Sequence, residues 1–250
     1  MKLISTLFAA AIVVATLSSC EKEPTSTDGD FQIEMEYVWA MSGAPFTMNT
    51  MLHHPMTGDS LKFTTFKHYL SNVKLHHLDG TVWKAEESYH LVDLSDPNSL
   101  VLDFTGVPAG EYTSLEITFG VDSLRNVSGV QTGALDPANN MFWSWNSGYI
   151  MIKAEGESPN SPTGAFAYHL GGFTGPDATV LTKELTFPSG ELLEISPDGA
   201  PVVHALANPA KLFHTQGTVG NEPMVHAPGT TAGIMASDFN QGVYIDHVHL

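Results

Sequence analysis

The chain has 250 residues, of which 42% are hydrophobic, and its 27 Asp and Glu against 10 Lys and Arg give a formal net charge of −17. This charge argues against a nucleic-acid-binding protein, because phosphates need a basic surface. One domain of this length can bury a sizeable core. That core must stabilise the fold by itself, since the single cysteine, Cys20, allows no intramolecular disulfide.

The first thirty residues carry the features of a lipoprotein signal and a tether. Lys2 precedes an apolar run over residues 3–17 that is too short to span a bilayer, and small residues then lead to Cys20. The alternative, an ordinary signal peptide with an incidental cysteine, leaves a lone thiol in an oxidising compartment. We therefore expect a signal peptide over 1–19, acyl chains on Cys20, a polar tether over 20–30 and one domain over 31–250.

Short alternating segments separated by Gly, Pro and Asp-Gly turns predict an all-β protein. In residues 31–41, Ile33, Met35 and Tyr37 alternate with polar neighbours, which indicates a half-buried strand. Asp79-Gly80 predicts a hairpin between residues 70–78 and 81–84. Further strands are expected over residues 89–94, 100–104, 112–121, 149–155, 165–170, 180–187, 192–195 and 243–249. Together they predict an antiparallel β-sandwich.

Two short helices are expected in the connections between these strands. Asp136 is a good N-cap and Pro137 suits the first helical position, so we expect one or two helical turns from Pro137 to Trp145. Residues 231–239 form the second candidate, with Thr230 or Thr231 as its cap.

Common catalytic signatures are missing, so we expect a protein that is not an enzyme. The chain contains no nucleophile elbow, no HExxH zinc motif, no dinucleotide or phosphate loop, and no cysteine besides the one assigned to lipidation. A hydrolase with a pair of carboxylates is a third option, but no pattern among the 27 acidic residues identifies such a pair.

Histidine is conspicuously abundant, with 12 in the chain. His247 and His249 are two residues apart on a predicted strand, so their side chains leave the same face and can both reach one ion. Two surface histidines at the end of a strand are an equally simple reading. His169 and His90 are flanked by apolar residues, where a hydrogen-bonded core histidine is more common than a metal ligand.

A second cluster combines Met48, Met51 and Met56 with His53 and His54. Thioether and imidazole ligands together favour copper over magnesium or calcium. The alternative is a methionine-containing loop that packs on the sandwich.

Oxygen donors close together in the sequence offer calcium as a second metal. They are Asp122, Asp136, Asn139 and Asn140. The spacing of an EF-hand loop is absent, and the capping of turns by Asp and Asn explains these residues more simply.

Several motifs that occur in order make the chain resemble the MbnP family of copper-binding proteins, named for a methanobactin-associated member. They are FKHYLSNVKL, SYHLVDL, GVDSLRNVSGVQTGALDPANNMFWSWNSGYIMIKAEG, FAYHLGGF and IDHVHL. The resemblance covers roughly residues 31–250. It implies a β-sandwich that binds copper outside the cytoplasm. In characterised relatives, a dihaem partner of the MbnH type oxidises a tryptophan to kynurenine, which then contributes to the metal site. The resemblance implies the same modification here.

Trp143 and Trp145 match the family's MFW-W-GY run and are the candidates for such an oxidation. From the residues alone, they are either core anchors, the commonest place for tryptophan, or exposed redox-active rings. The modified tryptophan of copper-binding relatives lies close in sequence to a ligand histidine. Here no tryptophan is two residues from a histidine.

The leading hypothesis is a lipid-anchored copper-binding protein of the outer membrane, facing the periplasm or the cell surface, without enzymatic activity. His169, His247 and His249 are the first-choice ligands, with His90 and His226 in reserve. The membrane and a dihaem oxidase are the expected partners. The rival hypothesis is a metal-free surface interaction or glycan-binding sandwich whose tryptophan-rich loop stacks on a partner.

Overall fold

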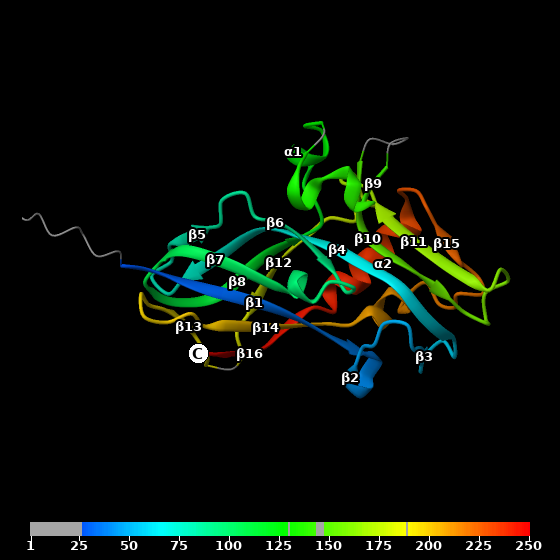
Figure 1. The fold of residues 1–250 in the computed structure, drawn as a ribbon, viewed down its shortest axis with the longest axis horizontal. Helices are drawn as coiled ribbons and strands as arrows, with labels where there is room; N and C mark the ends of the chain where they lie inside the picture. Colours follow the sequence, from blue (N-terminus) through cyan, green and yellow to red (C-terminus); the bar gives the residue numbers. More distant parts are fainter. Residues whose placement is uncertain (1–26, 130, 144–147, 189) are drawn as a thin grey trace, which may run out of the picture.

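The computed structural model describes residues 27–129, 131–143, 148–188 and 190–250 and confirms the predicted all-β, sandwich-like architecture (Figure 1). Within these residues, one sheet contains β1 (Asp28–Trp39), β2 (Ala44–Pro45), β7 (Val101–Pro108), β14 (Val202–Ala207) and β16 (Tyr244–His249). The larger sheet contains β3 (Met51–His53), β4 (Ser60–His77), β5 (Val82–Lys84), β6 (Tyr89–Asp93), β8 (Gly110–Phe119), β9 (Phe142–Trp143), β10 (Gly148–Glu157), β11 (Ala165–Gly171), β12 (Leu181–Thr186), β13 (Leu193–Ile195) and β15 (Met224–Val225).

The smaller sheet follows from the period of two in β1. Phe31, Ile33 and Met35 are buried, whereas the side chains between them face away from the core. β1 lies between β14, which runs parallel to it, and β7, which runs antiparallel, and β16 then pairs antiparallel with β14. The parallel β1–β14 pair departs from the purely antiparallel sandwich that we expected, and β11–β15 is a second parallel pair.

The larger sheet is organised around the long strand β4, which pairs with β8 and β10 along much of its length. The hairpin predicted at Asp79-Gly80 is present between β4 and β5, and Gly80 has the positive φ of 88° that the turn requires.

The main core lies between the sheets and is rich in phenylalanine, including the fully buried Phe31, Phe63, Phe66 and Phe239. A second, smaller core forms on the larger sheet around Tyr69, Trp143, Tyr149 and Met151. The unusual aromatic content of residues 119–172 is thus explained largely by packing, because these rings bury apolar area against one another.

The helices are short. α2 (Thr230–Gln241) confirms the second predicted helix and contacts β11 and β12, although its N-cap is Gly229 and not a threonine. α1 (Ser123–Asn126) was not expected. The 3-10 turns are η1 (Ala40–Ser42), η2 (Pro97–Leu100), η3 (Gly133–Leu135), η4 (Pro137–Asn139) and η5 (Pro209–Phe213).

The helix expected over residues 137–145 is wrong beyond its first turn. Asp136 caps η4 as predicted, with its side chain accepting a hydrogen bond from the Ala138 N–H. Asn140 then adopts a left-handed conformation with φ of 59°, which ends the turn, and Phe142 and Trp143 form β9.

The N-terminal features predicted from the sequence fall mostly outside the described residues, including the signal peptide and Cys20. β1 begins at Asp28, three residues before the start that we expected for the domain. None of the helices in the described part of the chain has the length and apolar character needed to cross a membrane.

Candidate metal centre

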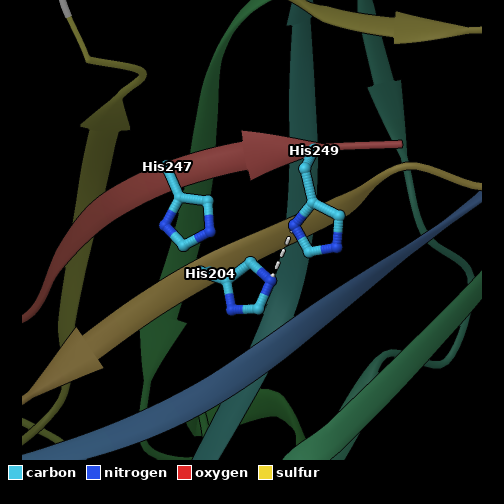
Figure 2. Close-up of side chains that lie close together, drawn as sticks. All are labelled: His204, His247 and His249. Carbon is cyan, nitrogen blue, oxygen red and sulfur yellow. Dashed lines mark hydrogen bonds between the residues drawn. The ribbon is translucent and has the colours of Figure 1, made fainter.

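Three imidazoles converge on the outer face of the smaller sheet. Each of His204, His247 and His249 offers a ligand nitrogen, and these atoms all lie within 4.8 Å of one another. Among the described residues, no other set of three or more histidine, cysteine or carboxylate side chains meets this condition. Figure 2 shows one ring nitrogen of each residue facing the space between the three rings.

Strand pairing explains why these residues meet. His204 on β14 lies directly opposite His247 on β16, and His249 lies opposite Val202. Between the Ala205–Ile245 and His204–His247 pairs, Asp246 is an extra residue that forms a β-bulge.

Because of the bulge, the side chains at the end of β16 point to the opposite side of the sheet from the one that regular alternation would give them. Ile245 points into the core, so an unbroken alternation would place residues 247 and 249 on the same side as Ile245. The extra residue shifts the phase, so Val248 packs against the core and the two histidines face outward with His204.

The distances suit an ion held by imidazole. Nε2 of His204 is 3.0 Å from Nδ1 of His249. Ligand nitrogens around a tetrahedral ion with bonds of about 2.0 Å are about 3.3 Å apart. The ring centroids of His204 and His247 are 4.3 Å apart with an interplanar angle of 6°, and those of His204 and His249 are 4.7 Å apart. Because the lone pair of an imidazole lies in the plane of its ring, the nearly parallel rings of His204 and His247 must turn toward each other before both bind one ion.

Carboxylates surround the three rings. Glu36 Oε1 is 2.5 Å from Nδ1 of His204, and Glu34 Oε2 is 3.8 Å from the same atom. Asp246 Oδ2 is 2.9 Å from Nδ1 of His247. The side chain of His204 is largely buried, whereas His249 is exposed. This negative surrounding favours a cation.

An open pocket of about 330 Å³ adjoins the cluster. Its lining includes His249 together with Glu191 and Glu194.

His169 and His226 form a separate pair on the larger sheet, so the expectation that His169 joins His247 and His249 is not met. Their rings stack with centroids 4.5 Å apart, and Nε2 of His169 is 2.6 Å from Glu155 Oε1. Burial lowers the pKa of His169, an effect that the hydrogen bond to Glu155 opposes. These two predicted ligands are thus brought together, but away from the three-imidazole cluster.

His90 belongs to neither group. Its ring packs against Phe104 at a centroid distance of 5.3 Å, and its buried Nε2 has no hydrogen-bond partner among the residues that the structure describes. Burial lowers the pKa of His90, and Asp103 acts in the opposite direction. His90 is therefore a side chain that packs beside the core.

The methionine and histidine cluster at residues 48–56 is divided between the core, where Met48 and His54 pack, and the surface. His54 is only 2% exposed. Its Nε2 bonds to the Ala210 carbonyl at 3.0 Å, and its Nδ1 accepts from the Thr57 N–H at 3.1 Å. Both ring nitrogens are therefore occupied, whereas Met51 and Met56 extend into solvent.

The oxygen donors considered for calcium act as caps. Asp122 caps α1 and also accepts hydrogen bonds from Asn72 Nδ2 at 2.6 Å and Tyr89 Oη at 3.0 Å. Asp136 caps η4, and Asn139 donates to backbone carbonyls. Their oxygen and amide groups thus hold turns in place, as expected for these residue types.

Of the two candidate tryptophans, only Trp143 lies within the described residues. Trp143 is 6% exposed and belongs to the smaller core of the larger sheet, so it is a core anchor and lies on a different sheet from the three imidazoles. Its ring covers Gly171, where an added Cβ would lie 2.5 Å from Trp143 Cζ3. Trp145 lies outside the described residues.

His204 is the candidate ligand that sequence reasoning missed, because β14 itself was not predicted. A local signal does exist, since Val202–Ala207 is an apolar six-residue run with Pro201 before it and Pro209 soon after. Such a run is consistent with a buried strand. Its one polar member is the histidine.

Comparison with known proteins agrees with the family motifs found in the sequence, except that IDHVHL at residues 245–250 lies beyond the matched region. The profile of the MbnP family matches residues 28–230. Among solved structures, the chain is similar to "MbnP from Methylosinus trichosporium", with 13% identity, a TM-score of 0.48, and coverage of 75% of this chain and 78% of that chain. A sequence comparison with curated proteins finds no match.

Proposed function

The chain belongs to the MbnP family, and we propose that it is a lipid-anchored, extracytoplasmic protein that binds copper without acting as an enzyme. The observation that carries the proposal is the convergence of His204, His247 and His249, whose ligand nitrogens lie within 4.8 Å of one another. The family association with copper supports the choice of metal.

The three imidazoles are suitable ligands for copper. Imidazole binds copper and zinc well, whereas magnesium and calcium prefer oxygen ligands. Because only the neutral form of imidazole offers a lone pair, binding weakens as the pH falls and the rings become protonated. The nearby carboxylates compensate part of the charge of a divalent ion.

The experiment is a copper titration of the purified protein at neutral pH against a competing chelator. We expect one high-affinity copper that is lost when His204, His247 and His249 are all replaced by alanine. His53→Ala is the matched control, since His53 is exposed and lies outside the cluster. Absence of bound copper in the unmodified protein, or unchanged affinity in the triple variant, refutes the proposal.

We also propose that the tryptophan run is a substrate for a dihaem oxidase, as the family resemblance implies. Trp143 is the described candidate, and its ring lies over Gly171. His169 is two residues from Gly171 on β11, so both residues belong to the same face of that strand. A kynurenine at position 143 would therefore belong to the face that carries His169 and its stacked partner His226.

A further inference from the structure

The protonation pattern of the three imidazoles can be read from their neighbours. An ionised carboxylate only accepts hydrogen bonds. Nδ1 of His204, 2.5 Å from Glu36 Oε1, must therefore carry the hydrogen that it donates. A neutral imidazole has one N–H, so the lone pair of His204 is on Nε2.

The same argument applies to His247. Its Nδ1 is 2.9 Å from Asp246 Oδ2, so this nitrogen donates and Nε2 keeps the lone pair. In Figure 2, a nitrogen of His247 faces the space shared with the other two rings. Asp246 thus combines two roles, because it is also the extra residue of the bulge that turns His247 outward.

His249 differs, since its neighbour at Nδ1 is another imidazole. The 3.0 Å contact joins this atom to the lone-pair nitrogen, Nε2, of His204. Nδ1 of His249 is therefore the donor in the metal-free protein. When a metal occupies this space, the hydrogen leaves Nδ1 and an equivalent one is taken up from water at Nε2 of the exposed ring. The ring stays neutral, and no net proton is released.

We propose that Glu36 and Asp246 are positioning residues that hold His204 and His247 in the Nδ1–H tautomer, so that the site presents Nε2 of His204, Nε2 of His247 and Nδ1 of His249 to the metal. This inference rests on the proposed copper function. Carboxylates that accept from the second nitrogen of a ligand histidine orient the ring and raise its basicity.

The test compares Glu36→Ala with Glu34→Ala. Both side chains are 44% exposed and both approach Nδ1 of His204, but only Glu36 is within hydrogen-bonding distance. We expect Glu36→Ala to lower the affinity for Cu(II) about 10- to 100-fold at one fixed pH, and Glu34→Ala to leave it unchanged. Asp246→Asn should also weaken binding, because a neutral amide accepts less strongly than a carboxylate.

A second readout separates positioning from a general loss of negative charge. Nitrogen-15 NMR of the metal-free protein reports which ring nitrogen carries the hydrogen. We expect the Nδ1–H form for His204 and His247, and a shift of His204 towards the Nε2–H form in Glu36→Ala. An Nε2–H tautomer at His204 in the unmodified protein, or an affinity loss with no change of tautomer, overturns the inference.

The two failures remain distinguishable. If the unmodified protein binds copper but Glu36→Ala changes neither affinity nor tautomer, the positioning role is wrong and the copper function stands. If the unmodified protein binds no copper, the proposed function fails, and the proposed donor set fails with it.

Discussion

His204 and His247 stand directly opposite each other on β14 and β16, with ring planes only 6° from parallel. The two residues are far apart in the chain, and neither predicts the other from local sequence. Their alignment depends on the bulge at Asp246, which sets the register of the last strand and turns its histidines outward.

Deleting Asp246 separates the two roles of this residue. Without the extra residue, Ile245 and His247 are neighbours, so regular alternation keeps Ile245 in the core and both histidines of β16 outward. The deletion removes only the carboxylate beside Nδ1 of His247. We therefore expect the deletion variant and Asp246→Ala to bind copper with a similar, moderately weakened affinity, well above that of the triple-alanine variant. A deletion variant that binds copper no better than the triple-alanine variant contradicts this account.

His68 should make stability depend on pH. It bonds through Nε2 to Tyr37 Oη at 2.5 Å and thereby links the two sheets, and burial lowers its pKa to about 4. In the unfolded chain, where the histidine pKa is about 6.5, this residue binds a proton first as the pH falls. The contribution of His68 to the free energy of unfolding is therefore fully present above about pH 6.5 and is lost progressively as the pH falls toward 4.

This effect is measured by urea unfolding at pH 7.5 and pH 5. We expect the unmodified protein to lose about 2 kcal/mol more than His68→Gln over this interval. Glutamine keeps a polar group near Tyr37 but does not titrate. Equal losses in both proteins would show that His68 does not contribute.

Gly171 should be intolerant of even one added methyl group. A Cβ there would lie 2.5 Å from Trp143 Cζ3 and 2.8 Å from the Tyr149 carbonyl oxygen, which is backbone and cannot easily move. We expect Gly171→Ala to lower the free energy of unfolding by about 1–3 kcal/mol. Gly199→Ala is the control, because its nearest neighbour is the Ser196 hydroxyl at 3.2 Å. Equal stability of the two variants would argue against tight packing at Trp143.

Oxidation of the tryptophan run can be checked by peptide mass spectrometry after co-expression with a dihaem partner of the MbnH type. We expect kynurenine at position 143 or 145 and unmodified tryptophan at Trp39 and Trp83. Expression without the partner is the control. Intact tryptophans in every peptide would reject this part of the proposal.

The lipid anchor is tested by Cys20→Ala. Acyl chains on this thiol would hold the protein to the membrane, so we expect the variant to leave the membrane fraction while its copper affinity stays the same. Protease treatment of intact cells then distinguishes the cell surface from the periplasm, since only a surface protein is degraded. Equal membrane association of both proteins would reject lipidation at Cys20.

The sequence by itself determined the all-β class, most strands, the family and the pairing of His247 with His249. These features are local: strand alternation, Asp-Gly turns and a two-residue spacing depend on neighbours in the chain. The motif signal in residues 119–172 identified the family, and the structure showed that its Trp143 packs in a core.

Only the tertiary structure decided which histidines share a site. His204 joins His249 across 45 residues of chain and Glu36 across 168. The register that aligns them comes from burial of Ile245 and Val248 on either side of a bulge, whereas His169 is paired with His226 on the other sheet. Spacing in the sequence specifies the face of one strand. The partner strand is selected by long-range packing, which no local pattern encodes.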